Sequence, residues 1–263
     1  MDLTKLVLFQ ELVLEIIIEN LVMNSKKLLC VKILYKYLYL YINIIFMFSS
    51  IEEVHSRLKL KYGSFQDELP EQKMSLRYLT GNEKVLEIGG NIGRNSLIIA
   101  SILNEYLNGN DKNLVVLESC NNIFNLLYEN KIINNFNFNI ECSALSKKQL
   151  IQKDWTTIPS NIILDGYYPV NIIDYQSLEN KYQIKFDTLI LDCEGAFYYI
   201  LQDMPEILNN INLIIMENDY LDITHKNFVD KVLINNNFYR DYVEAGGWGC
   251  CYNCFFEVWK RKK

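Results

Sequence analysis

The segment 85–93, with the sequence VLEIGGNIG, combines a short apolar run with a glycine-rich turn. Val85 to Ile88 has the composition of a buried strand, and Gly89, Gly90 and Gly93 follow it before a helical pattern begins. Glycine has no Cβ, so such a turn lets backbone N–H groups and the positive end of the helix approach a ligand. The spacing is G-G-x-x-G rather than G-x-G-x-x-G, so the dinucleotide fingerprint is not met. The segment predicts a pocket of nucleotide type.

Acidic side chains follow three further apolar runs. Glu118 follows the run within NLVVLES at 113–119, and Asp192 and Glu194 follow the run within DTLILDCEGAF at 187–197. Glu217 follows the run within NLIIMEND at 212–219. The carboxyl ends of parallel strands meet at one edge of a sheet, where the ligands of open α/β proteins bind. We therefore expect Asp192 and Glu194 to point toward this crevice, and Glu118, at the tip of the second strand, to accept hydrogen bonds from ribose hydroxyls.

Two of these segments resemble one family. Glu87-x-Gly89-x-Asn91-x-Gly93 and Asp192-x-Glu194-Gly-Ala are similar to motifs of the FkbM family of S-adenosylmethionine (SAM) dependent methyltransferases. The second motif usually reads Lys-Ile-Asp-Val-Glu-Gly-Ala-Glu in that family. Here Leu189 or Ile190 stands at the position of the lysine, and Phe197 replaces the last glutamate. The resemblance covers about residues 85–259, and these departures put in doubt any role of the missing lysine and glutamate.

The resemblance implies a role for each matching residue. Glu87 would face the amino group of SAM, the glycine loop would pass under its ribose and carboxylate, and 143–144 would lie beside the adenine. The cofactor-binding residues implied are Glu87, Gly89, Gly90, Asn91, Gly93, Glu118, Ser143, Ala144 and Asp192. A hydroxyl is a poor nucleophile at neutral pH, so a carboxylate base would help the transfer of a methyl group to it. We expect Asp192 or Glu194 to be this catalytic base and prefer Glu194.

The expected activity is SAM-dependent methyl transfer, in the EC 2.1.1 class. By resemblance, the acceptor is a hydroxyl on a sugar, a glycan precursor or a small natural product. Two alternatives from other classes stay open: a SAM-binding or nucleotide-binding module without catalysis, and a membrane-tethered interaction protein that uses the same fold. We assign no metal ligand. Mg²⁺ stays open as an additional cofactor, because Asp192 with Asn218 or Asp219 would supply hard oxygen ligands.

The order of apolar runs predicts an α/β fold. Strands near 85–88, 113–118, 138–146, 188–191 and 212–217 alternate with helical stretches, of which the last two are expected at 196–209 and 224–236, and strands near 238–244 and 250–259 close the chain. This predicts the Rossmann-like seven-stranded sheet of SAM methyltransferases, mostly parallel with an antiparallel terminal hairpin, and helices on both faces. Residues 147–186 form a long insertion, which is typical of lids and binding loops.

The chain divides into an apolar extension (1–50), a polar helical lead-in (51–80) and the methyltransferase domain (81–263). Three interpretations of the extension stay open: a helical appendage, a membrane anchor through 28–51, or a misassigned start with Met47 as the first residue. Tyr37 to Ile51 is uncharged but shorter than the roughly 20 residues that span a bilayer.

Charge and cysteine content limit the partners and the location. A net charge of −6 argues against nucleic acid as a partner. Seven scattered cysteines suit a reducing compartment, so we expect a cytoplasmic protein, with membrane association left open. We expect Cys250, Cys251 and Cys254 to lie on the last strand rather than to bind zinc, and we expect no catalytic role for His55 or His225. The oligomeric state is not predicted.

Overall fold

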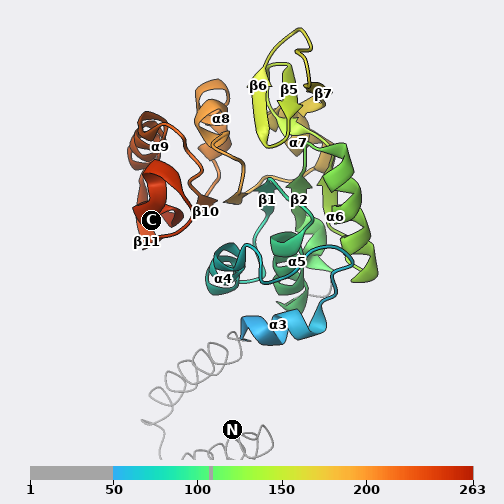
Figure 1. Cartoon of the computed structure of the whole chain (residues 1–263). Helices are drawn as coiled ribbons and strands as arrows, with labels where there is room; N and C mark the ends of the chain where they lie inside the picture. Colours follow the sequence, from blue (N-terminus) through green and yellow to red (C-terminus); the bar gives the residue numbers. More distant parts are fainter. Residues whose placement is uncertain (1–49, 107–108, 263) are drawn as a thin grey trace, which may run out of the picture. The chain divides into compact units, whose positions relative to one another are not determined.

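The computed structural model describes residues 50–106 and 109–262 (Figure 1). The elements of these residues, in chain order, are α3 (Ile51–Arg57), α4 (Leu69–Tyr78), β1 (Val85–Ile88), α5 (Arg94–Tyr106), η1 (Asn110–Asn113), β2 (Leu114–Leu117), α6 (Asn121–Ile133), β3 (Asn139–Glu141), β4 (Ala144–Leu145), β5 (Leu150–Lys153), β6 (Thr156–Pro159), β7 (Tyr168–Val170), β8 (Ile172–Ile173), α7 (Tyr175–Tyr182), β9 (Thr188–Leu191), α8 (Phe197–Asp203), η2 (Pro205–Leu208), β10 (Leu213–Glu217), α9 (Ile223–Asn235), β11 (Phe238–Glu244), η3 (Gly249–Cys254) and β12 (Phe256–Arg261).

Seven strands form the central sheet in the order β11-β12-β10-β9-β1-β2-β3. The pairs from β10 to β3 are parallel, whereas β12 is antiparallel to both β10 and β11. Strands β1, β2 and β9 are buried along their whole length, as expected for parallel strands covered on both faces. The predicted seven-stranded, mostly parallel α/β fold with an antiparallel terminal hairpin is confirmed.

After β1 the chain proceeds toward one edge of the central sheet, and after β9 it proceeds toward the opposite edge. Helices α5 and α6 connect β1, β2 and β3 toward one edge, and α8 and α9 follow β9 and β10 toward the other edge. Because crossovers between parallel strands are right-handed, the two pairs of helices cover opposite faces of the sheet. Helix α4 packs on α5 and also contacts β10 and β12, so residues of the lead-in segment lie against the same sheet.

The structure corrects three predicted elements. The expected strand at 138–146 is divided into β3 of the central sheet and β4, which pairs with β8 instead. The helix expected at 196–209 is divided into α8 and η2 at Pro205. The cysteines at 250–254 lie in η3, a 3-10 helix, and not on a strand; β12 begins only at Phe256.

The insertion between β3 and β9 forms a small domain-like layer of its own. Strands β5, β6 and β7 make an antiparallel sheet in the order β6-β5-β7, and Figure 1 shows this sheet beyond the ends of β1 and β2. Two residues, Asp154 and Trp155, connect β5 to β6. The insertion therefore stands over the carboxyl edge of the central sheet.

The predicted apolar extension and its membrane segment 28–51 lie outside the described residues, apart from the last two positions of that segment. Within 50–106 and 109–262, every helix lacks either the length or the apolar character that crossing a bilayer requires.

Candidate functional site

The glycine loop turns sharply between β1 and α5. Gly89 and Gly93 both have a φ of +92°, and Asn91 has a φ of +46°. A Cβ on Gly89 would lie 1.6 Å from the carbonyl oxygen of Asp192, and a Cβ on Gly90 would lie 2.2 Å from Cγ1 of Val116. The glycines at 89 and 90 are thus required by close packing against neighbouring strands.

The N–H groups of this loop already have acceptors within the protein. Those of Gly89 and Gly90 donate to the carbonyl oxygen of Leu117 at 3.0 and 2.9 Å, and that of Gly93 donates to the carbonyl oxygen of Gly90 at 2.8 Å. The N–H groups of Asn91 and Ile92 donate to Glu118 Oε2 and to Asn91 Oδ1. The backbone N–H groups of 89–93 therefore have acceptors within the protein, and the contact of the loop with a ligand stays a prediction.

Glu118 lies directly after β2 and is 7% exposed. Its Oε2 accepts the N–H of Asn91 at 3.0 Å, and its Oε1 accepts the N–H of Cys120 at 2.7 Å. Burial raises the pKa of Glu118, while these backbone hydrogen bonds oppose the rise. A carboxylate oxygen accepts more than one hydrogen bond, so Glu118 keeps acceptor capacity for ligand hydroxyls.

Glu87 is the third residue of β1 and is 2% exposed. The hydroxyl of Ser96, in the first turn of α5, donates to its Oε2. Burial raises the pKa of Glu87 to about 8, and the charge of Glu68 adds to this rise. Glu87 lines a small cavity together with Gly89, Asp192 and two carboxylates of the lead-in segment, Glu68 and Glu71.

Asp192 and Glu194 follow β9, as predicted, but their surroundings differ. The N–H of Asp192 donates to the carbonyl oxygen of Ile88 at 3.1 Å, and burial raises the pKa of this aspartate well above its usual value, with the charges of Glu68 and Glu71 adding to the rise. Glu194 is exposed and has a φ of +52°; burial of its carboxyl group raises its pKa as well. Glu194 is the carboxylate that can exchange protons with solvent.

Three carboxylates lie close together at the ends of β9 and β10. Asp192, Glu217 and Asp219 each offer one oxygen, and these three oxygens lie within 4.8 Å of one another. Burial raises the pKa of Glu217, and a hydrogen bond with Glu71 raises it further; burial also raises the pKa of Asp219 to about 7. Carboxylate oxygens at this spacing fit a divalent cation. Asn218 is turned elsewhere, because its Nδ2 donates to the carbonyl oxygen of Cys254 at 2.6 Å.

Most of the predicted site residues line one cleft, which has a volume of about 230 Å³. The predicted site residues that line it are Gly89, Asn91, Glu118, Ser143, Ala144, Asp192 and Glu194. Residues of the insertion and of α8 form the rest of its wall. Gly90 and Glu87 line the smaller cavity instead, and Gly93 lines neither space. The structure thus brings together residues that are more than 100 positions apart in the sequence.

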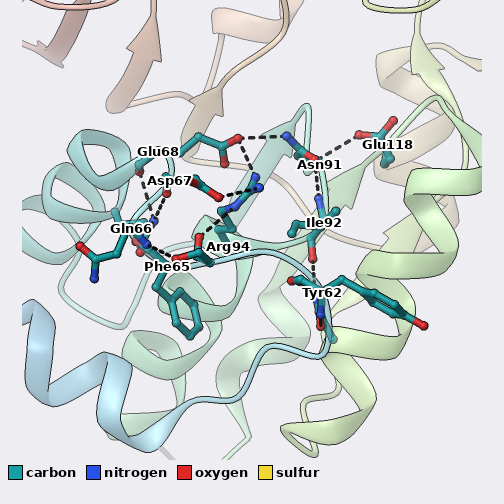
Figure 2. Close-up of polar contacts among 12 residues, drawn as sticks. Tyr62, Phe65, Gln66, Asp67, Glu68, Asn91, Ile92, Arg94 and Glu118 are labelled. Atoms are coloured by element: carbon teal, nitrogen blue, oxygen red, sulfur yellow. Dashed lines mark hydrogen bonds and ion pairs between the residues drawn. The ribbon is translucent and has the colours of Figure 1, made fainter.

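The sequence reasoning missed three charged residues beside the loop. Glu68 accepts hydrogen bonds from Nδ2 of Asn91 at 3.0 Å and from Nη1 of Arg94 at 2.7 Å, as Figure 2 shows. Glu71, which is 5% exposed, has no hydrogen-bond partner for its Oε2. Both glutamates lie at the start of α4, where acidic residues are common because they interact favourably with the helix dipole. Only their contacts with residues far away in the sequence indicate that they belong to the site.

The two histidines lie in helices and neither lines the cleft, although the ring of His225 contacts the edge of Tyr199, which does. His55 Nε2 lies 2.7 Å from Oε1 of Gln72, and its ring stacks on Phe65. His225 stacks on Tyr198 with a centroid distance of 3.7 Å.

No family model matches the chain, and no curated protein matches it. Among solved structures it is similar to the O-methyltransferase from Bacillus cereus in complex with S-adenosylhomocysteine (SAH), at 14% identity over 80% of this chain and 90% of that chain, with a TM-score of 0.47. It is also similar to the ribosomal protein L11 methylase from Lactobacillus delbrueckii subsp. bulgaricus, at 13% identity over 78% and 82%, with a TM-score of 0.46. A protein of the NADB-Rossmann superfamily from Streptococcus agalactiae matches at 11% identity over 73% and 67%, with a TM-score of 0.46. Identities this low assign no substrate.

Proposed function

We propose that this chain is a SAM-dependent methyltransferase that acts on a hydroxyl of a sugar, a glycan precursor or a small natural product. One observation carries the proposal. The residues after β1, β2 and β9, which the FkbM resemblance matches to cofactor and catalytic positions, line a single cleft at the carboxyl edge of the sheet. This edge is where ligands of open α/β sheets bind.

The residues of the cleft fit the chemistry of SAM. Glu118 has acceptor capacity for the two ribose hydroxyls, and Ser143 with Ala144 forms the wall beside the adenine. The carboxylates of Glu87 and Asp192 lie in the small cavity next to Gly89 and would hold the amino group. Buried carboxylates with raised pKa values favour a positively charged ligand, since such a ligand stabilises their ionised form. When bound, SAM supplies a methyl carbon that is electrophilic because of the adjacent sulfonium.

Glu194 is the base in this proposal. Its carboxyl group faces the cleft from the turn after β9, and its φ of +52° together with the following Gly195, at +77°, directs the chain away from the sheet. A raised pKa makes a carboxylate a stronger base toward a hydroxyl proton. Asp192, which is more deeply buried, would position the cofactor rather than exchange protons with water.

Calorimetric titration of the full chain with SAM and with SAH tests cofactor binding. We expect micromolar dissociation constants, and Glu118→Ala should weaken both by about tenfold because each ribose hydroxyl loses its acceptor. Labelled SAM then tests transfer to hydroxyl compounds. Asp192→Asn should weaken SAM binding, because it removes a carboxylate that would hold the amino group. Glu194→Gln should retain SAM binding and reduce turnover at least 100-fold. Absence of SAM and SAH binding to folded protein would refute the proposal.

Two outcomes separate the alternatives that the sequence left open. Tight binding of SAM without transfer to any tested acceptor would indicate a cofactor-binding module without catalysis. A chain that binds no SAM but associates with membranes would favour the interaction protein.

The same transfer assay tests for a metal. A dependence of transfer on Mg²⁺ would assign the cation to Asp192, Glu217 and Asp219, whereas full activity in the presence of a chelator would mean that these carboxylates share protons instead.

A further inference from the structure

The outer wall of the cleft is formed by the insertion. Leu150, Gln152, Trp155, Thr157, Ile158 and Pro159 all line the cleft, and they come from β5, β6 and the turn between them. The opposite wall includes Ala196 and Tyr199 of α8 and the segment before it. The predicted cofactor residues lie at the base of the same cleft, so the space between the insertion and α8 is available for a second ligand.

One contact joins the insertion to the end of β2, and a second holds the hairpin turn of the insertion. Ser119 Oγ donates to Oε1 of Gln152 at 3.0 Å, and Gln152 Nε2 donates to the carbonyl oxygen of Asp154 at 3.1 Å. Gln152 is 5% exposed and therefore connects the end of β2 to the hairpin turn through a buried side chain. On the neighbouring strand β7, burial raises the pKa of Tyr168 to about 12, and a hydrogen bond with Cys120 adds to this rise. The hairpin turn is thus held in place rather than left free.

Trp155 occupies this fixed turn and is 58% exposed. Tyr199 lines the opposite wall and is 51% exposed. Large aromatic rings usually bury most of their surface, so the indole of Trp155 leaves apolar surface exposed at the cleft. The ring of Tyr199 already makes edge contacts with Tyr198 and His225. A ligand with a flat or apolar face would cover the indole of Trp155.

The charges of the cleft restrict that ligand. Its acidic lining residues are Glu118, Asp192, Glu194 and Asp203. Lys148 is the one basic residue among the described residues that line the cleft, and its Nζ lies 2.8 Å from Asp203 Oδ2. Phosphates and carboxylates need unpaired basic side chains or free N–H groups. An anionic acceptor would meet repulsion here instead.

We propose that the β5–β6 turn builds the acceptor subsite, with Trp155 as its stacking platform, and that the acceptor is an uncharged sugar rather than a sugar phosphate or a nucleotide sugar. The hydroxyls of a sugar donate hydrogen bonds to the carboxylates of the cleft, and the apolar face of the ring covers the indole. This inference rests on the proposed function, because it takes the base of the cleft as the cofactor site.

Ligand-detected NMR on the full chain saturated with SAH tests the subsite without turnover. The probes are methyl glycosides of glucose, galactose, mannose and rhamnose, glucose 1-phosphate, UDP-glucose, and catechol as an uncharged planar compound. We expect at least one glycoside to bind with saturation transfer to its ring protons, and we expect weaker or no binding of the two phosphates. Preference for a phosphate, preference for catechol, or no binding of any glycoside to the SAH complex would overturn the inference.

Three variants assign the effect to one ring. Trp155→Ala should weaken glycoside binding about tenfold, and Trp155→Phe, which keeps an aromatic face, should recover part of it. Trp248→Ala is the matched control, since Trp248 is 46% exposed but does not line the cleft. SAH affinity should stay unchanged in all three. Unchanged glycoside affinity in folded Trp155→Ala would overturn the platform, and an equal loss of SAH affinity would assign the ring to the cofactor.

The same titrations separate this inference from the proposed function. If wild-type chain binds no SAH, the proposed function fails first. If SAH binds while the glycosides behave against expectation, the cofactor site stands and only the acceptor subsite is refuted.

Discussion

Asn91 and Glu68 both have left-handed backbone conformations, with φ values of +46° and +55°, and their side chains are joined by a hydrogen bond of 3.0 Å. Figure 2 shows that Arg94 contacts the same carboxylate of Glu68, while the backbone of Asn91 reaches Glu118. The start of α4, the glycine loop and the end of β2 are therefore connected through polar groups. Non-glycine residues in this conformation are uncommon and cost free energy, which these contacts offset.

Substitutions at Asn91 should separate the cost of the backbone from the loss of the side chain. Asn91→Gly and Asn91→Ala both remove the hydrogen bond to Glu68, but only glycine adopts a positive φ without strain. We expect Asn91→Ala to unfold at lower urea concentration, with a free energy of unfolding about 1 kcal/mol below that of Asn91→Gly. Equal stability of the two variants would mean that the loop adopts another conformation.

Removal of the Glu68 carboxylate should destabilise the protein and weaken SAH binding. Arg94 has a side chain that is 12% exposed, and without Glu68 its remaining acidic partner would be Asp67 at 3.3 Å. We expect Glu68→Ala to lower the free energy of unfolding by about 1–3 kcal/mol. Glu129→Ala is the matched control, since its ion pair with Lys61 is exposed, and it should change stability little. Similar losses in the two variants would contradict a stabilising role for the contacts of Glu68 with Asn91 and Arg94.

The pKa of Glu87 predicts how stability depends on pH. Burial raises this pKa from 4.5 to about 8, so between these values the folded protein holds a proton that the unfolded chain has lost. Folding is therefore favoured at low pH, and this contribution decreases as pH rises toward 8. Glu87→Gln should remove a slope of about 1.4 kcal/mol per pH unit from the free energy of unfolding measured in urea between pH 5 and 8. Parallel curves for the variant and the wild type would place the proton elsewhere.

Turnover should increase with pH through the raised pKa of Glu194 and then reach a plateau. Protonation removes the base, so the rate falls below this pKa, which burial places above 4.5. Glu194→Gln should show a low rate without this dependence, measured with labelled SAM and saturating acceptor. An unchanged acidic limb in the variant would assign it to another group, for which Asp219, with its pKa raised to about 7, is the nearest candidate.

The hairpin turn should depend on Gln152. Gln152→Leu keeps the volume of the side chain but removes its contacts with Ser119 and with the carbonyl of Asp154. We expect the emission spectrum of Trp155 to shift and the glycoside affinity to fall several-fold. The spectrum is measured in a Trp248→Phe background, in which the other tryptophan, Trp259, is buried. SAH affinity should stay constant. A spectrum and an affinity like those of the background protein would show that the turn is held by its strands alone.

The central strands and their acidic ends could be predicted from the sequence, since runs such as 188–191 are continuously apolar and end at charged residues. The division of 138–146 could not, because β4 pairs with β8, which lies almost 30 positions later. Residues 249–254 form a 3-10 helix although their sequence alternates apolar and polar residues as a strand does. Gly249 has a φ of +71°, and Cys251 is buried within the helical turn. Pro205 did carry a signal for the end of α8, since a proline disfavours helical geometry at the residue before it.

Most of the cleft lining was predictable because it follows strand ends, but the buried acidic contacts of Glu68 and Glu71 were not. These residues lie before the first strand, and their contacts with Asn91 and Glu217 span more than 20 and 140 positions. Periodicity describes only neighbours within a few residues. A side chain that reaches a site from a separate element has no local pattern that would reveal it.

Strand β12 lies between β10 and β11, both of which precede it in the chain. The position between β10 and β11 therefore stays empty during folding until residues 256–261 pair there. Until then β10 has an open edge, and Trp259, which is 3% exposed in the finished structure, has not yet packed. The central sheet is therefore complete only once β12 has paired with both strands, and a chain that lacks residues 256–261 would keep open edges on β10 and β11.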